Sequence, residues 1–238
     1  MKSKAIDIDM ARSASPPLLV SILEAAFRKP KFYFERLLLG ASYHLLTDQS
    51  LSLPQLVAVG NIFGEPQVQL LGDYRLDDPL NIFIFNYNKI GGVKPHVRAT
   101  HWHTDDSYFA IPAKATILCA QALPTSGGST QFIDTEAVLK VMPTTIQLRI
   151  EGWRAVHKYQ SRRSQAKVAI RTPEEEALTP DVFILNTKVP ETGQAALYIN
   201  PNRIDHIEGL SLTQSDEILD ELYAFAFDED FNKAINGW

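Results

Sequence analysis

An imidazole and a carboxylate stand two residues apart at His103 and Asp105, inside the segment THWHTDDSY that spans residues 100–108. In an extended segment, side chains at i and i+2 point to the same face, so both groups can reach one point. A nitrogen and an oxygen donor of this kind make up two of the three ligands in the 2-His-1-carboxylate triad, which holds non-haem Fe(II) and leaves positions open. The third ligand would have to come from elsewhere in the chain, so the fold must bring distant segments together here.

A bare His-x-Asp tripeptide is a weak signal, because most such tripeptides are solvated turns. The segment also offers a competing ligand, since His101 lies two residues before His103 and would share its strand face. A rival interpretation is a non-catalytic jelly-roll binding module in which His103 and Asp105 belong to a surface turn. A zinc hydrolase is less favoured, because the sequence contains no His-Glu-x-x-His motif and no cysteine pair.

Several motifs downstream of His103 favour the metal-site interpretation. An apolar run covers residues 115–120, and it is followed by a Leu-Pro pair and by a Gly-Gly-Ser-Thr sequence that ends at Thr130. Further along lie a Pro-x-Thr-Gly sequence ending at Gly193 and a Leu-Tyr-x-Asn sequence ending at Asn200. This succession closely resembles the taurine dioxygenase / 2,4-dichlorophenoxyacetate dioxygenase family of Fe(II)- and 2-oxoglutarate-dependent oxygenases.

The resemblance implies roles for individual residues. His103 and Asp105 correspond to the iron ligands, and Thr130 corresponds to a threonine that contacts 2-oxoglutarate. His101 would instead line the pocket or face solvent. The implied enzyme uses Fe(II) as cofactor and 2-oxoglutarate as co-substrate, activates O2 and abstracts a hydrogen from a small organic substrate.

The pattern of short β-type runs and helices, together with the resemblance, predicts a mainly β fold with flanking helices (α+β), a double-stranded β-helix or jelly roll. We expect one domain over residues 1–238, because barrels and sandwiches of this size are often undivided. Besides the His103 segment, the expected strands cover residues 43–47, 80–85, 116–123, 130–133, 182–185 and 196–201. The expected helices cover residues 17–27, 135–139 and 144–150 and begin at the capping residues Ser52 and Ser211.

The resemblance extends from about Tyr43 to Trp238, where the sequence ends. Family members continue into further strands that carry the distal iron-binding histidine and a 2-oxoglutarate-binding arginine. We therefore expect a jelly roll that is incomplete at its C-terminal end, in a fragment of such an enzyme; the alternative is a catalytically impaired remnant. His101, His157 and His206 are the histidines that could substitute as the third ligand.

Composition and charge narrow the range of partners. Lys and Arg number 23 against 28 Asp and Glu, a net charge of −5 that argues against a nucleic-acid-binding surface. The single cysteine, Cys119, excludes an internal disulfide and suits a reducing compartment, and its apolar surroundings predict a buried, inert thiol. No apolar signal core and no segment of membrane-spanning length are present, so we expect a cytoplasmic protein that does not enter the membrane. Homo-oligomer formation is left open.

Residues 158–181 form a polar stretch with Arg162, Arg163, Lys167 and Arg171 in its first half. A stretch of this length in a compact domain is either disordered or functional, often as a lid. Its basic half could meet an anionic substrate, although a solvated insertion explains the composition equally well.

Overall fold

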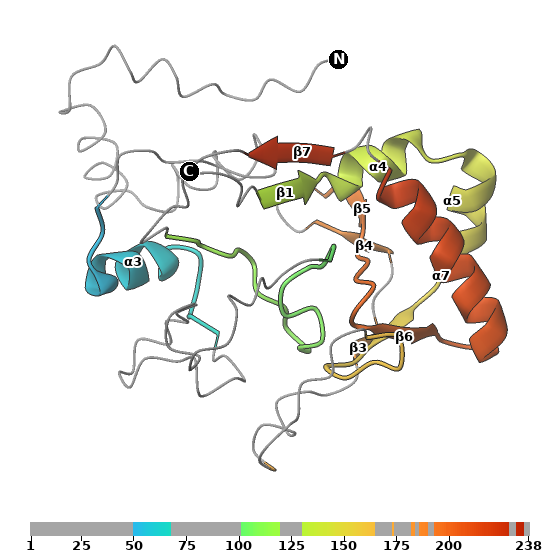
Figure 1. The fold of residues 1–238 in the computed structure, drawn as a ribbon, viewed down its shortest axis with the longest axis horizontal. Helices are drawn as coiled ribbons and strands as arrows, with labels where there is room; N and C mark the ends of the chain where they lie inside the picture. The colour runs from blue at the N-terminus through green and yellow to red at the C-terminus, as the bar shows by residue number, and fades with distance from the viewer. Residues whose placement is uncertain are drawn as a thin grey trace, which may run out of the picture.

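The computed structural model describes residues 50–67, 101–119, 130–164, 173, 182–183, 186–189, 193–228 and 232–235. These ranges contain helices and short strands (Figure 1). The helices are α3 Leu53–Gly60, α4 Thr135–Val141, α5 Thr144–Ile150 and α7 Leu212–Ala226. The strands are β1 Thr130–Ile133, β2 Ala155–His157, β3 Val182–Phe183, β4 Asn186–Lys188, β5 Ala195–Leu197, β6 Ile204–Ile207 and β7 Asn232–Ile235.

Within the described ranges the strands pair antiparallel in small sheets. β1 pairs with β7, β2 lies between β3 and β6, and β4 pairs with β5. His157, the last residue of β2, lies opposite Val182 on one side and Ile204 on the other. The register between β2 and β6 shifts at Val156 and His157, an irregularity of the kind that a β-bulge produces. Apart from the β4–β5 pair, these ladders join segments that are distant in the sequence.

Helices α4 and α7 begin at residues whose side chains cap them. The Asp134 carboxylate accepts hydrogen bonds from the backbone N–H groups of Glu136 and Ala137, both at 3.1 Å. The Ser211 hydroxyl accepts from the Gln214 N–H at 3.3 Å, and the Gln214 side-chain oxygen accepts from the Ser211 N–H at 3.2 Å. These bonds satisfy donors that the start of a helix leaves unpaired, so the local sequence determines where both helices begin.

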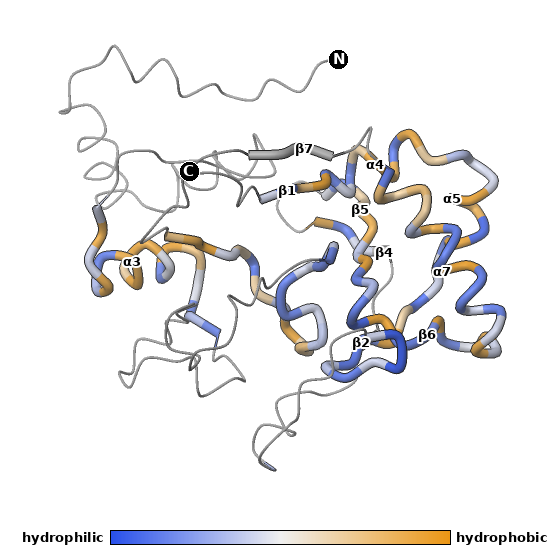
Figure 2. The backbone as a smooth tube through the Cα atoms, in the orientation of Figure 1, coloured by the Kyte–Doolittle hydropathy of each residue, from blue (hydrophilic) through white to orange (hydrophobic). Residues whose placement is uncertain are grey.

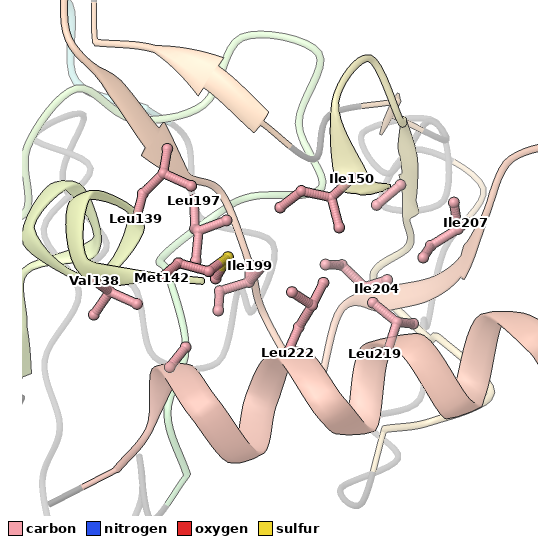
Figure 3. Close-up of a cluster of buried hydrophobic side chains, with 12 residues drawn as sticks. Val138, Leu139, Met142, Ile150, Leu197, Ile199, Ile204, Ile207, Leu219 and Leu222 are labelled. Atoms are coloured by element: carbon pink, nitrogen blue, oxygen red, sulfur yellow. The ribbon is translucent and has the colours of Figure 1, made fainter. Parts of the chain in front are cut away.

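The main hydrophobic core lies between α4, α5 and α7 and the strands β2, β5 and β6 (Figure 3). Helix α7 buries Ser215, Leu219, Leu222 and Ala226, which share one face, and the alternation of hydrophobic and hydrophilic positions along this helix is visible in Figure 2. The other buried members are Val138, Leu139, Met142, Ile150, Ala155, Leu197, Ile199, Ile204 and Ile207. Because the core includes residues on both sides of the β5–β6 connection, it also holds that connection in place.

Several predictions from the sequence are confirmed. The strand over residues 130–133 and the helix over residues 144–150 have the predicted bounds, and the helix after Asp134 extends slightly further than predicted. Helices begin directly after Ser52 and Ser211, as their capping chemistry predicts.

Several other predictions of local structure, including the strand at His103, are wrong. Residues 102–104 are irregular and residues 105–108 form a turn, so the predicted strand is absent here. Asp106 has a φ of 53°, a left-handed conformation that a strand cannot contain. Residues 116–119 are also irregular, and the strand predicted over residues 196–201 ends at Leu197 because the chain then turns. Cys119 is only partly buried, whereas the sequence predicted a buried thiol.

The predicted helix over residues 17–27, the strands over residues 43–47 and 80–85, and most of the polar stretch over residues 158–181 lie outside the described residues. Among the helices that the structure describes, none has the length and apolar character needed to cross a membrane.

Candidate metal centre

The structure brings the side chains of His103 and Asp105 together on the loop formed by residues 101–119. His103 Nε2 lies 3.3 Å from Asp105 Oδ1. The two side chains are 36% and 46% exposed, so a small ion can reach both of them. The prediction that both groups reach one point therefore agrees with the structure, although a turn rather than a strand brings them there.

A hydrogen bond orients the His103 ring. Its Nδ1 lies 2.7 Å from the backbone carbonyl oxygen of His101. Because a carbonyl oxygen can only accept, Nδ1 carries a proton and donates it. In the neutral ring, Nε2 then holds the free lone pair and faces Asp105. A histidine that donates through one nitrogen to a carbonyl and presents the other nitrogen to a metal is the usual metal-ligand arrangement.

Asp105 is also held by a second hydrogen bond. Its Oδ2 accepts from the Thr116 hydroxyl at 2.7 Å, which leaves Oδ1 directed at His103. The hydrogen bond with Asp105 raises the pKa of His103 above its ordinary value, and partial burial opposes that shift. The hydrogen bond with His103, supported by the one from Thr116, lowers the pKa of Asp105. Both shifts favour a protonated imidazole beside an ionised carboxylate, and a metal cation would compete with that proton for Nε2 and Oδ1.

The donor set fits a divalent metal of the first transition row. Two ligands in adjacent octahedral positions, each about 2.1 Å from the metal, lie about 3.0 Å apart. The distance of 3.3 Å between His103 Nε2 and Asp105 Oδ1 is close to that value. One imidazole and one carboxylate are two of the three ligands of the facial triad. Within the part of the chain that the structure describes, no third histidine, cysteine, aspartate or glutamate joins them.

The remaining predicted site residues lie away from this pair. Thr130 is partly buried at the start of β1, opposite Ile235, and the described contacts do not connect it to His103 or Asp105. His101 is exposed, in agreement with the prediction that it faces solvent or a pocket. His157 is buried in β2, and His206 in β6 lies 2.9 Å from Asp205, measured from Nδ1 to the carboxylate. None of these three histidines forms a ligand cluster with the pair.

An aromatic cluster follows the pair along the loop. The Tyr108 hydroxyl donates to Asp106 Oδ1 at 2.9 Å, and burial raises the pKa of Tyr108 well above its ordinary value. The Tyr108 ring meets the Tyr159 ring edge to face at 5.0 Å, and the Arg203 guanidinium stacks on both rings at 5.1 and 4.6 Å. Because the Tyr108 hydroxyl binds the Asp106 carboxylate, Asp105 and Asp106 have different partners.

Sequence reasoning missed the residues that support the pair. Nothing in the sequence identified Thr116 as the partner of Asp105, because the two are eleven residues apart in an irregular segment. In the sequence, Asn200 is the last residue of the Leu-Tyr-x-Asn motif, which assigns it no role. In the structure its amide nitrogen donates to the backbone carbonyl of Thr104, the residue between His103 and Asp105, at 2.8 Å.

Comparison with known proteins identifies the family of the chain. The profile of the family described as "Taurine catabolism dioxygenase TauD, TfdA family" matches residues 31–234. The chain belongs to this family. The TauD/TfdA resemblance inferred from the motifs around His103 and Thr130 is therefore confirmed.

Curated proteins similar to this TauD/TfdA chain include a synthase and two named dioxygenases. Pentalenolactone F synthase of Streptomyces avermitilis is 31% identical over 158 residues, which cover 60% of this chain and 51% of that protein. The (S)-phenoxypropionate/alpha-ketoglutarate-dioxygenase of Sphingobium herbicidovorans is 26% identical, with 75% of this chain and 64% of that protein covered. The alpha-ketoglutarate-dependent 2,4-dichlorophenoxyacetate dioxygenase of Cupriavidus pinatubonensis is 30% identical, covering 55% and 45%. The chain thus spans between 45% and 64% of the length of these relatives.

Solved structures are also similar in fold to this chain. A taurine dioxygenase from Burkholderia xenovorans superposes with a TM-score of 0.62 at 23% identity, over 80% of this chain and 61% of that one. The structure of AAD-2 in complex with Mn(II) and N-oxalylglycine superposes with a TM-score of 0.60 at 22% identity, over 81% and 66%. The TauD/TfdA chain therefore shares the fold of these proteins.

Proposed function

We propose that this TauD/TfdA-family protein is an Fe(II)- and 2-oxoglutarate-dependent dioxygenase that oxidises a small organic substrate. The observation that carries the proposal is the convergence of His103 Nε2 and Asp105 Oδ1, 3.3 Å apart on an accessible loop. A surface ion pair contributes only about 0–1 kcal/mol to stability, so stability alone is a weak reason for this arrangement. The curated relatives named as alpha-ketoglutarate dioxygenases point to the same chemistry.

His103 and Asp105 would hold the metal, and Thr130 would donate a hydrogen bond to 2-oxoglutarate. The third metal ligand would come from outside the described residues, because none of the described ones supplies it. Bound Fe(II), together with 2-oxoglutarate and O2, supplies the oxidant that attacks a C–H bond of the substrate.

The chain's own residues prepare the site for the cation. The His101 carbonyl keeps a proton on His103 Nδ1, so the proton that must leave is the one on Nε2. The Thr116 hydroxyl holds Asp105 Oδ2, which keeps Oδ1 directed at the same point as Nε2. Both ligands are thereby oriented before the metal arrives, which lowers the conformational cost of binding it.

For the architecture we propose a jelly roll that forms one domain over residues 1–238. The antiparallel pairing of all the described strands and the TM-scores of 0.60 and 0.62 to TauD-like structures support this proposal. Helices α4, α5 and α7 would be the flanking helices, because each contributes buried side chains to the same core (Figure 3).

The substrate that fits best is a small organic anion. Two of the relatives are named for phenoxypropionate and 2,4-dichlorophenoxyacetate, which carry a carboxylate. The Arg203 guanidinium lies over the ring of Tyr108, three residues after Asp105, at 5.1 Å. A cationic side chain therefore lies against the loop that carries the candidate metal centre.

The proposal is tested by the activity of the complete gene product. In the presence of Fe(II), O2 and a panel of aryloxyalkanoates and sulfonates, it should convert 2-oxoglutarate to succinate. His103→Ala should abolish this conversion, whereas the matched variant His101→Ala should retain it, because His101 contributes its backbone carbonyl and not its ring. Conversion that survives in His103→Ala would contradict the proposal. Failure of every panel member with intact uncoupled 2-oxoglutarate turnover would contradict only the substrate class.

A further inference from the structure

A buried polar cluster lies directly beneath the candidate metal loop. It consists of Ser107, His157 and Asn200, which are 0%, 0% and 1% exposed. The three residues come from the loop itself, from β2 and from the connection between β5 and β6. His157 Nδ1 lies 3.1 Å from Ser107 Oγ, and Asn200 Nδ2 donates to the same oxygen at 3.0 Å.

The Asn200 side chain reaches the loop between its two candidate ligands. Besides Ser107 Oγ, its Nδ2 donates to the backbone carbonyl of Thr104 at 2.8 Å, and Thr104 separates His103 from Asp105. Its Oδ1 accepts from the Asn202 N–H at 3.1 Å. One amide group therefore satisfies both of its donors and its acceptor, and two of the three bonds go to the loop.

Asn200 is itself held firmly by the β5–β6 connection. Its backbone carbonyl accepts from the N–H groups of Arg203 and Ile204 at 3.0 and 2.9 Å. Its neighbour Ile199 belongs to the main core, and the Ile199 carbonyl lies 3.4 Å from the Thr104 hydroxyl. The loop is thus attached to a segment that the hydrophobic core already fixes.

The Ser107 hydroxyl joins Asn200 to His157. The Ser107 oxygen accepts from Asn200, so its own hydroxyl proton can go to Nδ1 of His157. Buried polar groups are unfavourable unless they are paired, and a fully paired network selects one conformation of the segments that it joins. Here the selected conformation is that of the turn carrying both candidate ligands.

We propose that Asn200 is a positioning residue, which fixes the peptide between His103 and Asp105 and, with Ser107 and His157, sets the distance between the two ligating atoms. His157 then serves this cluster and not the metal as a third ligand. The inference rests on the proposed metal site and adds that the affinity of this site depends on a residue that touches neither the metal nor its ligand side chains.

The test combines a Mn(II) titration with hydrogen exchange on the 238-residue chain. Asn200→Ala should weaken Mn(II) binding by about 10–100-fold, the loss typical when the support of a metal ligand is removed. The same variant should speed amide exchange of residues 104–108 while leaving that of α7 unchanged. The matched control is Asn202→Ala, because only the backbone of Asn202 takes part in the described hydrogen bonds. Its affinity should stay within about twofold of the wild type.

Two further variants keep the test decisive if Asn200→Ala folds poorly. His157→Asn retains an acceptor near the position of Nδ1 and should bind Mn(II) more tightly than His157→Leu, which has none. Binding is measured well below the melting temperature of each variant, so that an unfolded fraction does not imitate weak binding.

Each outcome decides a separate question. Unchanged exchange of residues 104–108 in Asn200→Ala, or faster exchange with unchanged Mn(II) affinity, would overturn the positioning role. A wild-type chain that binds no Mn(II) would contradict the proposed function, and the exchange comparison would still decide whether Asn200 holds the loop.

Discussion

At the residue scale, two adjacent aspartates differ in what their carboxylates contact. Asp105 faces His103 and is held by Thr116, whereas Asp106 adopts a left-handed backbone conformation and accepts the Tyr108 hydroxyl. The turn between them, rather than the alternation of a strand, separates their directions. Only Asp105 is therefore placed to share a metal with His103.

We predict that Asp105→Asn weakens Mn(II) binding by about tenfold or more, because it removes the charge of a direct ligand. Asp106→Asn should leave the affinity within about twofold, since asparagine tolerates the φ of 53° and can still accept from Tyr108. Titration of both variants followed by the electron paramagnetic resonance signal of free Mn(II) measures the difference. Equal losses of affinity in the two variants would contradict the claim that Asp105 is a metal ligand and Asp106 is not.

Thr116 gives a second prediction at this scale. Thr116→Val keeps the shape of the side chain but removes the hydroxyl that donates to Asp105 Oδ2 at 2.7 Å. Metal affinity should fall by about tenfold in Thr116→Val and stay near the wild-type value in Thr116→Ser, which keeps the hydroxyl. Isothermal titration with Mn(II) compares the two. An equal affinity of the valine and serine variants would show that the Thr116 hydroxyl does not support metal binding.

At the scale of elements, helix α7 makes two kinds of contact with the rest of the chain. Its buried face packs against the core that also contains β5 and β6, and its polar face contacts the segment after β2 through ion pairs. The two faces allow separate tests of burial and of charge.

Burial is tested with one substitution at two positions of α7. Leu222→Ala should lower the free energy of unfolding by about 2–5 kcal/mol, because the side chain is fully buried and its loss leaves a cavity. Leu212→Ala in the same helix should change it by about 0.5 kcal/mol or less, because Leu212 is 52% exposed. Urea denaturation followed by circular dichroism measures both values. Similar effects at the two positions would contradict the assigned buried face.

Charge is tested at Asp216. Hydrogen bonds from Arg162, together with those from Arg163, lower the pKa of Asp216 to about 2. A carboxylate whose pKa is depressed in the folded state stabilises the fold above its unfolded pKa of about 3.9, and this contribution is lost as the pH falls through the folded value. Between about pH 5 and pH 2, the wild type should therefore lose more unfolding free energy than Asp216→Asn.

Unfolding is measured by urea titration at each pH. Glu217→Gln, at an exposed neighbouring position, is the matched control and should follow the wild-type pH dependence. An Asp216→Asn curve parallel to that of the wild type would show that these ion pairs do not contribute to folding.

At the scale of the whole molecule, the sequence predicted the elements with local signals better than those that depend on distant contacts. Capping residues Asp134 and Ser211 located two helices, because a helix start is encoded within a few residues. The strand predicted at His103 was wrong, because the Asp106 backbone and the Asn200 hydrogen bonds impose a turn that the alternation of side chains does not reveal.

The same division applies to the candidate site. His103 and Asp105 could be predicted because their spacing and the surrounding motifs are local. The supporting contacts of Thr116 and Asn200 could not be predicted, since they form only after the chain folds back over eleven and ninety-six residues. Family membership confirms the resemblance that the motifs indicated, but it does not supply these contacts.

The central claim, that His103 and Asp105 hold a metal ion, is tested most directly by Mn(II) titration of the wild-type chain, His103→Ala and His101→Ala. The wild type should bind one Mn(II), and His103→Ala should lose affinity by about tenfold or more because it removes a ligating nitrogen. His101→Ala should bind like the wild type, since its carbonyl still orients the ring of His103. No binding by the wild type, or equal losses in the two histidine variants, would contradict the claim.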